Sequence, residues 1–232
     1  MGFLVPILMC LAFIFVWIVL AKWIVALDRR RTKKVLLSSK RLDMKSMAAL
    51  IYLYFGGKLF LYSRWFPKRS PAGTVYREIP CVLIFGKKIF VLEVCSLPGT
   101  FHNTENETWT VIPPADYTKK KEVQIKSPLF LANERATLLK ELLEVLSCPF
   151  EFSVEPMVIL TDKDHRCAYP LQNGLYTVND AIAHIARFAP RTKRDRKKMK
   201  KINGMFFALF NRYSLSRRSA IARNNKMRQK KK

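Results

Sequence analysis

The chain has 232 residues, half of them hydrophobic, and its 42 lysines and arginines against 17 acidic residues give a net charge of +25. This size allows one ordinary hydrophobic core with further segments outside it. The five cysteines are an odd number without CxxC spacing, which excludes a disulfide framework and indicates reduced thiols.

The positive charge is concentrated toward the two ends of the chain. Residues 28–69 carry a net charge of +10 and residues 190–232 carry +16, whereas residues 70–189 carry −2. Charge that is segregated in this way indicates separate parts with different partners. We therefore predict four parts: 1–28, 29–73, 74–188 and 189–232.

The first part predicts a transmembrane anchor. Residues 3–21 contain no charge, the apolar run resumes after Lys22 and continues to Leu27, and about 20 apolar residues suffice to span a bilayer as a helix. No basic residue precedes the run and no small-residue cleavage site follows it, which excludes a cleaved signal peptide. The basic cluster of residues 29–34 predicts a single-pass protein of the cell membrane whose C-terminal domain is cytoplasmic.

A second apolar stretch covers residues 47–62 and is interrupted by Gly56-Gly57-Lys58. We interpret it as a core helix or membrane-surface helix inside a basic juxtamembrane segment, and a second membrane pass stays open as the alternative. The turn-rich residues 67–73 then predict a linker.

The third part predicts an α/β domain. Short apolar runs predict a β-hairpin that turns at residues 86–88, an edge strand and a further buried strand. Leucines at helical spacing predict a helix that opens at Ser127-Pro128, and a second helix is expected to begin after a cap at Asn179 or Asp180. We expect a small mixed sheet of three or four strands flanked by helices. The predicted strands are 81–85, 89–92, 109–112 and 156–161.

This part contains short sequence motifs in a distinctive order. The motifs are Ile-Phe-Val-Leu-Glu-Val at 89–94, Pro-Gly-Thr at 98–100, Trp-Thr at 109–110, Ser-Pro-Leu at 127–129 and Pro-Met-Val-Ile-Leu at 156–160. Over about residues 74–188 this order resembles the nuclease-related domain (NERD) family. The resemblance implies a restriction-endonuclease-like fold with a PD-(D/E)xK type of site for phosphodiester cleavage.

The resemblance also implies where the site residues should stand. The family pattern has an Asp on the first strand, Glu-x-Lys on the second and a Gln early in the following helix. This chain keeps the acid as Glu93 but has Pro80, Cys95 and Leu131 at the other three positions. Mg²⁺ prefers several hard oxygen ligands, which these residues do not supply. We therefore expect Glu93 to be vestigial and Cys95 to be a small apolar core residue, with no catalytic residue, metal or cofactor.

One further loop gathers side chains that bind metals in other proteins. It contains Asp162, Asp164, His165 and Cys167, and we interpret it as a solvated turn, with a metal site as the alternative. The chain has no Gly-rich phosphate loop, GxSxG or HExxH word.

The fourth part is a basic amphipathic segment. Its apolar residues recur at helical spacing and are flanked by lysines and arginines, which is typical of a helix that binds a membrane surface, binds a partner protein or packs back on its own domain. We favour anionic lipid, and nucleic acid is the alternative because the same charges would neutralise phosphates. The predicted contacts are Lys197, Lys198, Lys200, Lys201, Phe206, Phe207, Phe210 and Arg212.

Taken together, these features predict a membrane-anchored cytoplasmic domain that acts as a binding or scaffold module. The alternative is a nuclease, or a nucleic-acid-binding membrane protein, that uses a migrated site and the basic flanks. The sequence does not identify a protein partner. A second carboxylate within metal-bridging distance of Glu93 would favour the nuclease alternative.

Overall fold

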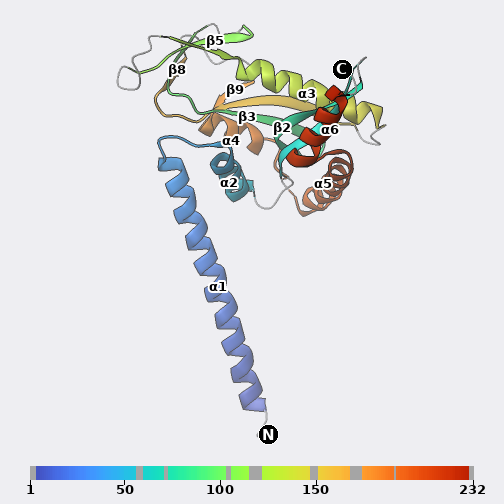
Figure 1. Cartoon of the computed structure of the whole chain (residues 1–232). Helices are drawn as coiled ribbons and strands as arrows, with labels where there is room; N and C mark the ends of the chain where they lie inside the picture. Colours follow the sequence, from blue (N-terminus) through green and yellow to red (C-terminus); the bar gives the residue numbers. More distant parts are fainter. Residues whose placement is uncertain are drawn as a thin grey trace. The chain divides into compact units, whose positions relative to one another are not determined.

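The computed structural model describes residues 4–55, 60–70, 73–102, 106–114, 122–146, 151–167, 174–190 and 192–229. The chain divides into two compact units, Met1–Ser39 and Lys40–Lys232. The first unit is built on the long helix α1, Leu4–Ser38 (Figure 1).

Helix α1 exposes large apolar side chains in the part whose side chains are described. Their burial is described from Phe15 onward. Nine of them between Phe15 and Val25 are 47–68% exposed: Phe15, Val16, Trp17, Ile18, Val19, Leu20, Trp23, Ile24 and Val25. Among the described residues, none of the helices combines the length and the apolar character needed to cross a bilayer. Much of the anchor predicted for residues 1–28 lies outside the residues whose side chains are described.

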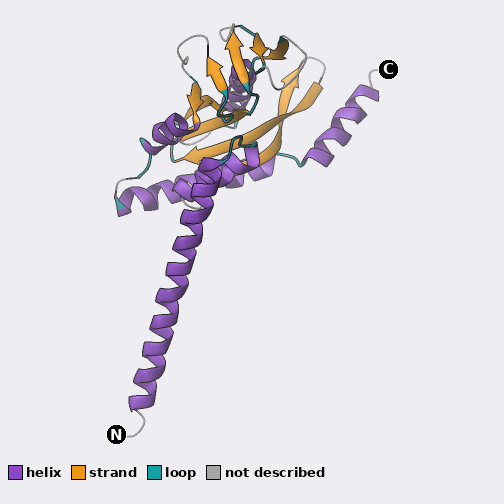
Figure 2. Cartoon of the chain, turned by 90° about the vertical axis from the view of Figure 1, so that its left-hand side faces the viewer, coloured by secondary structure: helices purple, strands orange, loops and turns teal. Residues whose placement is uncertain are grey.

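The second unit is organised around a five-stranded sheet with the order β1-β2-β3-β7-β9 (Figure 2). Strands β1, β2 and β3 pair antiparallel, whereas β3, β7 and β9 pair parallel, so the predicted mixed sheet is confirmed and is larger than expected. The predicted hairpin turns at Gly86, whose φ of 65° suits glycine. The strand bounds are Phe60–Ser70 (β1), Gly73–Phe85 (β2), Lys88–Cys95 (β3), Ser153–Leu160 (β7) and Leu175–Thr177 (β9).

A second sheet of four strands has the order β6-β5-β4-β8. Its strands are Gly99–His102 (β4), Thr108–Ile112 (β5), Val123–Lys126 (β6) and His165–Cys167 (β8). The prediction of an edge strand at residues 109–112 is wrong, because β5 pairs with both β4 and β6. Trp109 is fully buried on β5 and packs at 5.7 Å, ring to ring, against Phe101.

Helices cover both faces of the five-stranded sheet (Figure 1). Helix α3, Pro128–Val145, packs on β3 and β7, while α2, Met44–Phe55, and α4, Val178–Ala186, lie on the opposite face. The predicted helix start at Ser127-Pro128 is confirmed, and the Ser127 hydroxyl caps the helix by accepting a hydrogen bond from the Phe130 N–H at 3.1 Å. Thr177 caps α4, so the prediction of a cap at Asn179 or Asp180 is wrong.

The structure corrects the interpretation of residues 47–73. Helix α2 ends at Phe55, its buried residues include Leu50 and Ile51, and β1 begins at Phe60. The core-helix interpretation is therefore confirmed for residues 47–55. Residues 60–62 belong to β1, so one helix over residues 47–62, and with it the second membrane pass, is wrong. The linker predicted for residues 67–73 is also wrong in its first half, because β1 continues to Ser70 through Pro67. An edge strand tolerates proline because one row of its backbone N–H groups is not needed for pairing.

The basic C-terminal segment is part of the second unit. Helix α5, Lys193–Tyr213, buries Phe206 and Phe210 in a core cluster that also contains Val82 of β2 and Leu139 of α3. Asn203 fixes the helix to the β2–β3 turn, because its amide oxygen accepts from Gly86 N–H at 2.9 Å and its nitrogen donates to the Ile84 carbonyl at 3.2 Å. A last helix, α6, Arg217–Gln229, follows.

Phe206 and Phe207 form a matched pair that tests this packing. The exposed fraction is 1% for Phe206 and 39% for Phe207. We expect Phe206→Ala to lower the free energy of unfolding by about 3–5 kcal/mol, because it leaves a cavity in the core. Phe207→Ala should lower it by less than about 1 kcal/mol. Denaturant unfolding of the full chain in detergent measures both values, and equal effects would contradict the packing of α5.

Candidate functional site

Glu93 and Arg135 form a half-buried ion pair between β3 and α3. The Arg135 Nη1 group donates a hydrogen bond to Glu93 Oε2, and the exposed fractions of the two side chains are only 21% for Arg135 and 17% for Glu93. The Nε group of the same guanidinium donates to the backbone carbonyl of Glu78 on β2 at 3.1 Å. Arg135 therefore ties α3 to two neighbouring strands at once.

The surroundings of Glu93 disfavour its ionised form. Burial raises the pKa of Glu93 above its ordinary value, the charge and hydrogen bond of Arg135 oppose that rise, and the charge of Glu78 adds to it. Burial, with a contribution from the Glu93 charge, also raises the pKa of the Cys81 thiol on β2 well above its ordinary value. The guanidinium is thus the group that stabilises the carboxylate.

Glu78 is a further carboxylate whose charge acts on Glu93, and the sequence did not single it out. It lies on β2 two residues before Pro80, and its Oε1 atom accepts a hydrogen bond of 2.5 Å from the Ser63 hydroxyl. Ser63 has a φ of 46°, a left-handed conformation that is uncommon for a residue other than glycine. The strained residue on β1 therefore helps to hold the Glu78 carboxylate.

The three positions at which this chain departs from the family pattern have different surroundings. Pro80 is half-buried on β2. Cys95 has 5% exposure in an apolar cluster with Phe101 and Trp109, as expected of a small core residue. Leu131 lies half-buried on α3 and lines a cavity next to Arg135.

Arg135 was missed in the sequence, although a signal for it existed. It stands four residues after Leu131 and three before Leu138, so it shares the inward face of α3 with them. A charged residue on the apolar face of a helix indicates a buried partner. The sequence alone did not show that this partner is Glu93.

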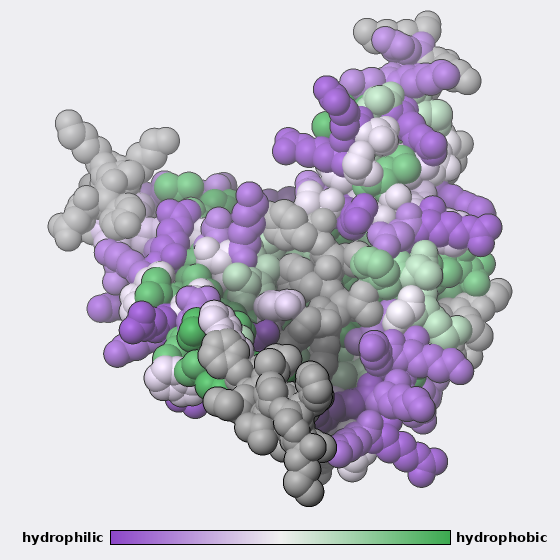
Figure 3. Space-filling view, turned by 90° about the horizontal axis from the view of Figure 1, so that it is seen from below, coloured by the Kyte–Doolittle hydropathy of each residue, from purple (hydrophilic) through white to green (hydrophobic). Residues whose placement is uncertain are grey.

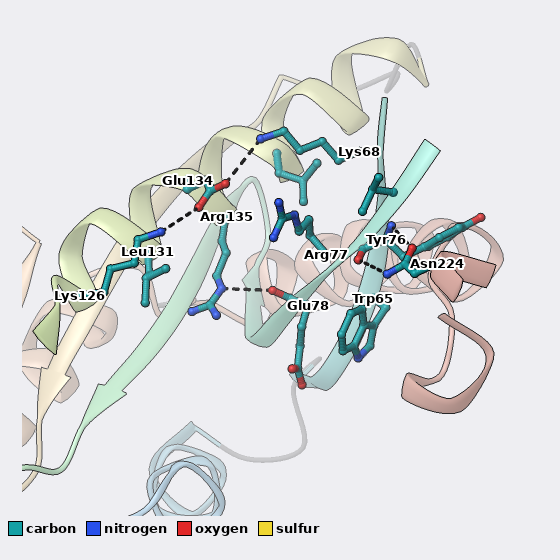
Figure 4. Close-up of a pocket in the computed structure, with 12 residues that line it drawn as sticks. Trp65, Lys68, Tyr76, Arg77, Glu78, Lys126, Leu131, Glu134, Arg135 and Asn224 are labelled. Carbon is teal, nitrogen blue, oxygen red and sulfur yellow. Dashed lines mark hydrogen bonds and ion pairs between the residues drawn. The ribbon is translucent and has the colours of Figure 1, made fainter. Parts of the chain in front are cut away.

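A cavity of about 440 Å³ opens beside Arg135 (Figure 4). Its walls come from β1, β2, β6, α3 and α6. In Figure 4, Arg77 extends from β2 toward α3, and Lys68 and Lys126 both reach Glu134. The side-chain amide of Asn224 on α6 bonds the backbone of Tyr76 at one end, accepting from its N–H at 2.9 Å and donating to its carbonyl at 3.1 Å.

The solvated turn predicted after β7 is confirmed for Lys163 and Asp164, which form an exposed turn, but not for Asp162. Asp162 is buried with 1% exposure, its Oδ1 atom accepts from the Asp164 N–H at 2.9 Å, and its carbonyl contacts His165 Nδ1. Lys40 pairs with Asp164 at 2.7 Å. The side chain of Cys167 lies outside the described residues. Within the described part of the chain, no three His, Cys, Asp or Glu side chains are grouped to hold a metal ion.

Helix α5 divides the predicted contact residues into two groups. Phe206 and Phe210 are buried in the core, so the prediction that they contact a membrane or nucleic acid is wrong. The cationic residues and Phe207 remain exposed, and long hydrophilic side chains project around the face shown in Figure 3. The exposed cations among the predicted contacts are Lys197, Lys198, Lys200, Lys201 and Arg212.

Comparison with known protein families identifies one part of the chain. Residues 50–161 match the model of the nuclease-related domain. The chain carries a nuclease-related domain. No curated protein and no solved structure matches the chain. The matched segment of the nuclease-related domain includes Glu78, Glu93 and Arg135, so the family resemblance is confirmed for the part that holds this site.

Proposed function

We propose that the nuclease-related domain of this chain does not cleave phosphodiester bonds and serves as a membrane-anchored binding module. The observation that carries this proposal is the hydrogen-bonded pair of Glu93 and Arg135. Cleavage of the PD-(D/E)xK type uses carboxylates to hold Mg²⁺. Here the one acid of the family pattern has a guanidinium as its partner.

The residues around Glu93 do not fit a Mg²⁺ site. Mg²⁺ requires hard oxygen ligands in near-octahedral geometry. Pro80 has no side-chain oxygen, the Cys95 side chain is a soft thiol buried among apolar groups, and the Glu78 carboxylate bonds Ser63. A divalent cation would also have to displace the Arg135 guanidinium from Glu93. These contacts support a site that binds without cleaving.

The full chain should therefore show no cleavage of single- or double-stranded DNA or RNA with Mg²⁺ or Mn²⁺. Glu93→Gln, prepared in the same way, controls for contaminating nucleases, because the chain and its variant should have equal backgrounds. Gel electrophoresis of labelled substrates provides the measurement. Metal-dependent cleavage that the chain shows and Glu93→Gln loses would contradict the proposal.

The anchoring part of the proposal is supported by α1. Residues 3–21 carry no charge, and the described apolar side chains between Phe15 and Val25 have no protein partner that buries them. Large exposed apolar surfaces mark membrane or protein contacts. The basic residues 29–34 follow, so the domain lies on the cytoplasmic side of a single-pass anchor.

Membrane attachment has a direct test. The full chain should remain in the membrane pellet after an alkaline wash, and a reporter fused after Lys232 should be active only in the cytoplasm. Val19→Asp together with Leu20→Asp should release the chain, because charged residues near the middle of an anchor cost about 2.5–3.5 kcal/mol each. Release of the unsubstituted chain by the alkaline wash, or reporter activity outside the cytoplasm, would contradict the proposed anchor.

Helix α5 offers the second contact with the bilayer. Its exposed lysines attract anionic headgroups with about 1 kcal/mol for each basic residue near the surface. Phe206 and Phe210 stay in the core, so this contact is electrostatic and does not involve insertion of the aromatic face. We propose that the binding module presents this cationic helix to anionic lipid.

A further inference from the structure

The cavity beside Arg135 has the size of a small-molecule site. Its volume of about 440 Å³ lies within the range of roughly 300–1,000 Å³ that is usual for ligand pockets. It is lined from several elements that are far apart in the sequence, among them β1, β2, β6 and α3. A ligand here would be held by the folded second unit rather than by one flexible segment.

Three cations from three different strands line this cavity. Lys68 lies on β1, Arg77 on β2 and Lys126 on β6. Lys68 and Lys126 share one carboxylate, that of Glu134, at 3.6 Å and 4.0 Å. Charge-assisted hydrogen bonds between such groups usually measure about 2.7–2.9 Å. Glu134 therefore lies between two ammonium groups and holds neither of them closely.

Arg77 adds a charge that Glu134 does not compensate. Its side chain is exposed, and within the described residues the structure gives it no ion pair and no side-chain hydrogen bond. Arg135, in contrast, is committed to Glu93. The cavity thus has more cationic groups than its carboxylates neutralise.

The remaining wall of the cavity is apolar and aromatic. Val75, Leu131 and Leu138 contribute aliphatic surface, and Trp65 and Tyr76 contribute rings (Figure 4). The cavity is also much larger than a single inorganic anion needs. These features fit a ligand whose anionic group is attached to an apolar or aromatic body.

We propose that this cavity binds a small molecule in which a phosphate group is attached to an apolar or aromatic body. The phosphate lies between Lys68, Arg77 and Lys126 and takes the place of the Glu134 carboxylate. A phosphate monoester carries close to two negative charges and three acceptor oxygens, which matches three cationic donors better than a carboxylate does. The ring or chain of the ligand packs on Leu131, Leu138 and Trp65.

The proposal is tested by calorimetric titration of the full chain in detergent with three simple probes. Phenyl phosphate should bind, inorganic phosphate should bind more weakly because it lacks the apolar body, and phenol should bind weakest because it lacks the charge. Phenyl phosphate that does not bind, or that binds no better than phenol, would overturn the proposal.

Variants connect the binding to these residues. Arg77→Ala and Lys126→Ala should each weaken phenyl phosphate about tenfold, as expected for the loss of one charged hydrogen-bond donor. Glu134→Gln should strengthen it severalfold because the competing carboxylate is neutralised. Lys140→Ala is the matched control, since Lys140 lies on the same helix but pairs with Glu144 outside the cavity. Unchanged affinity in both Arg77→Ala and Lys126→Ala, with circular dichroism showing a native fold, would overturn the site.

The phosphate group can belong to a soluble molecule or to a lipid, and a vesicle experiment distinguishes them. If vesicles with phosphatidic acid compete with phenyl phosphate and vesicles with phosphatidylserine do not, the ligand is a lipid headgroup. If neither competes, the ligand is soluble. Binding of duplex DNA without binding of phenyl phosphate would overturn the proposal.

Phosphate binding by Lys68, Arg77 and Lys126 is separate from cleavage at Glu93. If phenyl phosphate does not bind, the cleavage test is therefore unaffected.

Discussion

The hydrogen-bonded pair between Arg135 and Glu93 is the interaction on which the candidate site depends. Placing a carboxylate in a half-buried position on β3 costs free energy unless a charge of opposite sign is close by. Arg135 supplies that charge and, through its Nε group, also satisfies the Glu78 carbonyl on β2. One guanidinium therefore stabilises a half-buried acid and joins α3 to the sheet.

The cavity follows from the different lengths of β2 and β3. Strand β2 has 13 residues and β3 has 8, and their pairing runs only from Cys81 to Phe85 on β2. Where β2 continues alone beside β1, side chains bond its backbone: Arg135 bonds Glu78, and Asn224 bonds both backbone groups of Tyr76. The space left beside this extension lies between α3 and α6, and the cationic side chains of three strands surround it. The same extension thus explains both the position of Arg135 and the presence of a pocket next to it.

The sequence predicted the parts of the fold that local patterns determine. The hairpin at Gly86, the helix start at Ser127-Pro128 and the buried strand β7 are examples, because turn residues, helix-start residues and short apolar runs act over a few positions. It did not predict that Glu93 would be paired with Arg135, which is 42 residues away, since a helical pattern shows which face is buried but not what covers it. The same reason explains the error on α5: its apolar face was recognised, and the surface that receives it was assigned to lipid instead of to the core.

The most direct test is the stability of Arg135→Leu as a function of pH. The variant leaves Glu93 buried without its partner, and removal of one partner of a buried pair costs about 3–5 kcal/mol, with the lower end expected here because both groups are partly exposed. A glutamate whose folded pKa is raised stabilises the fold below its unfolded pKa of 4.5, and that stabilisation is lost as the pH rises through the folded pKa. Denaturant unfolding should therefore show a deficit of about 3 kcal/mol near neutral pH that shrinks as the pH falls toward that ordinary value. Adding Glu93→Leu to the Arg135→Leu variant should remove this pH dependence of the deficit. A deficit that is absent, or equal at every pH, would contradict the pairing of Arg135 with Glu93.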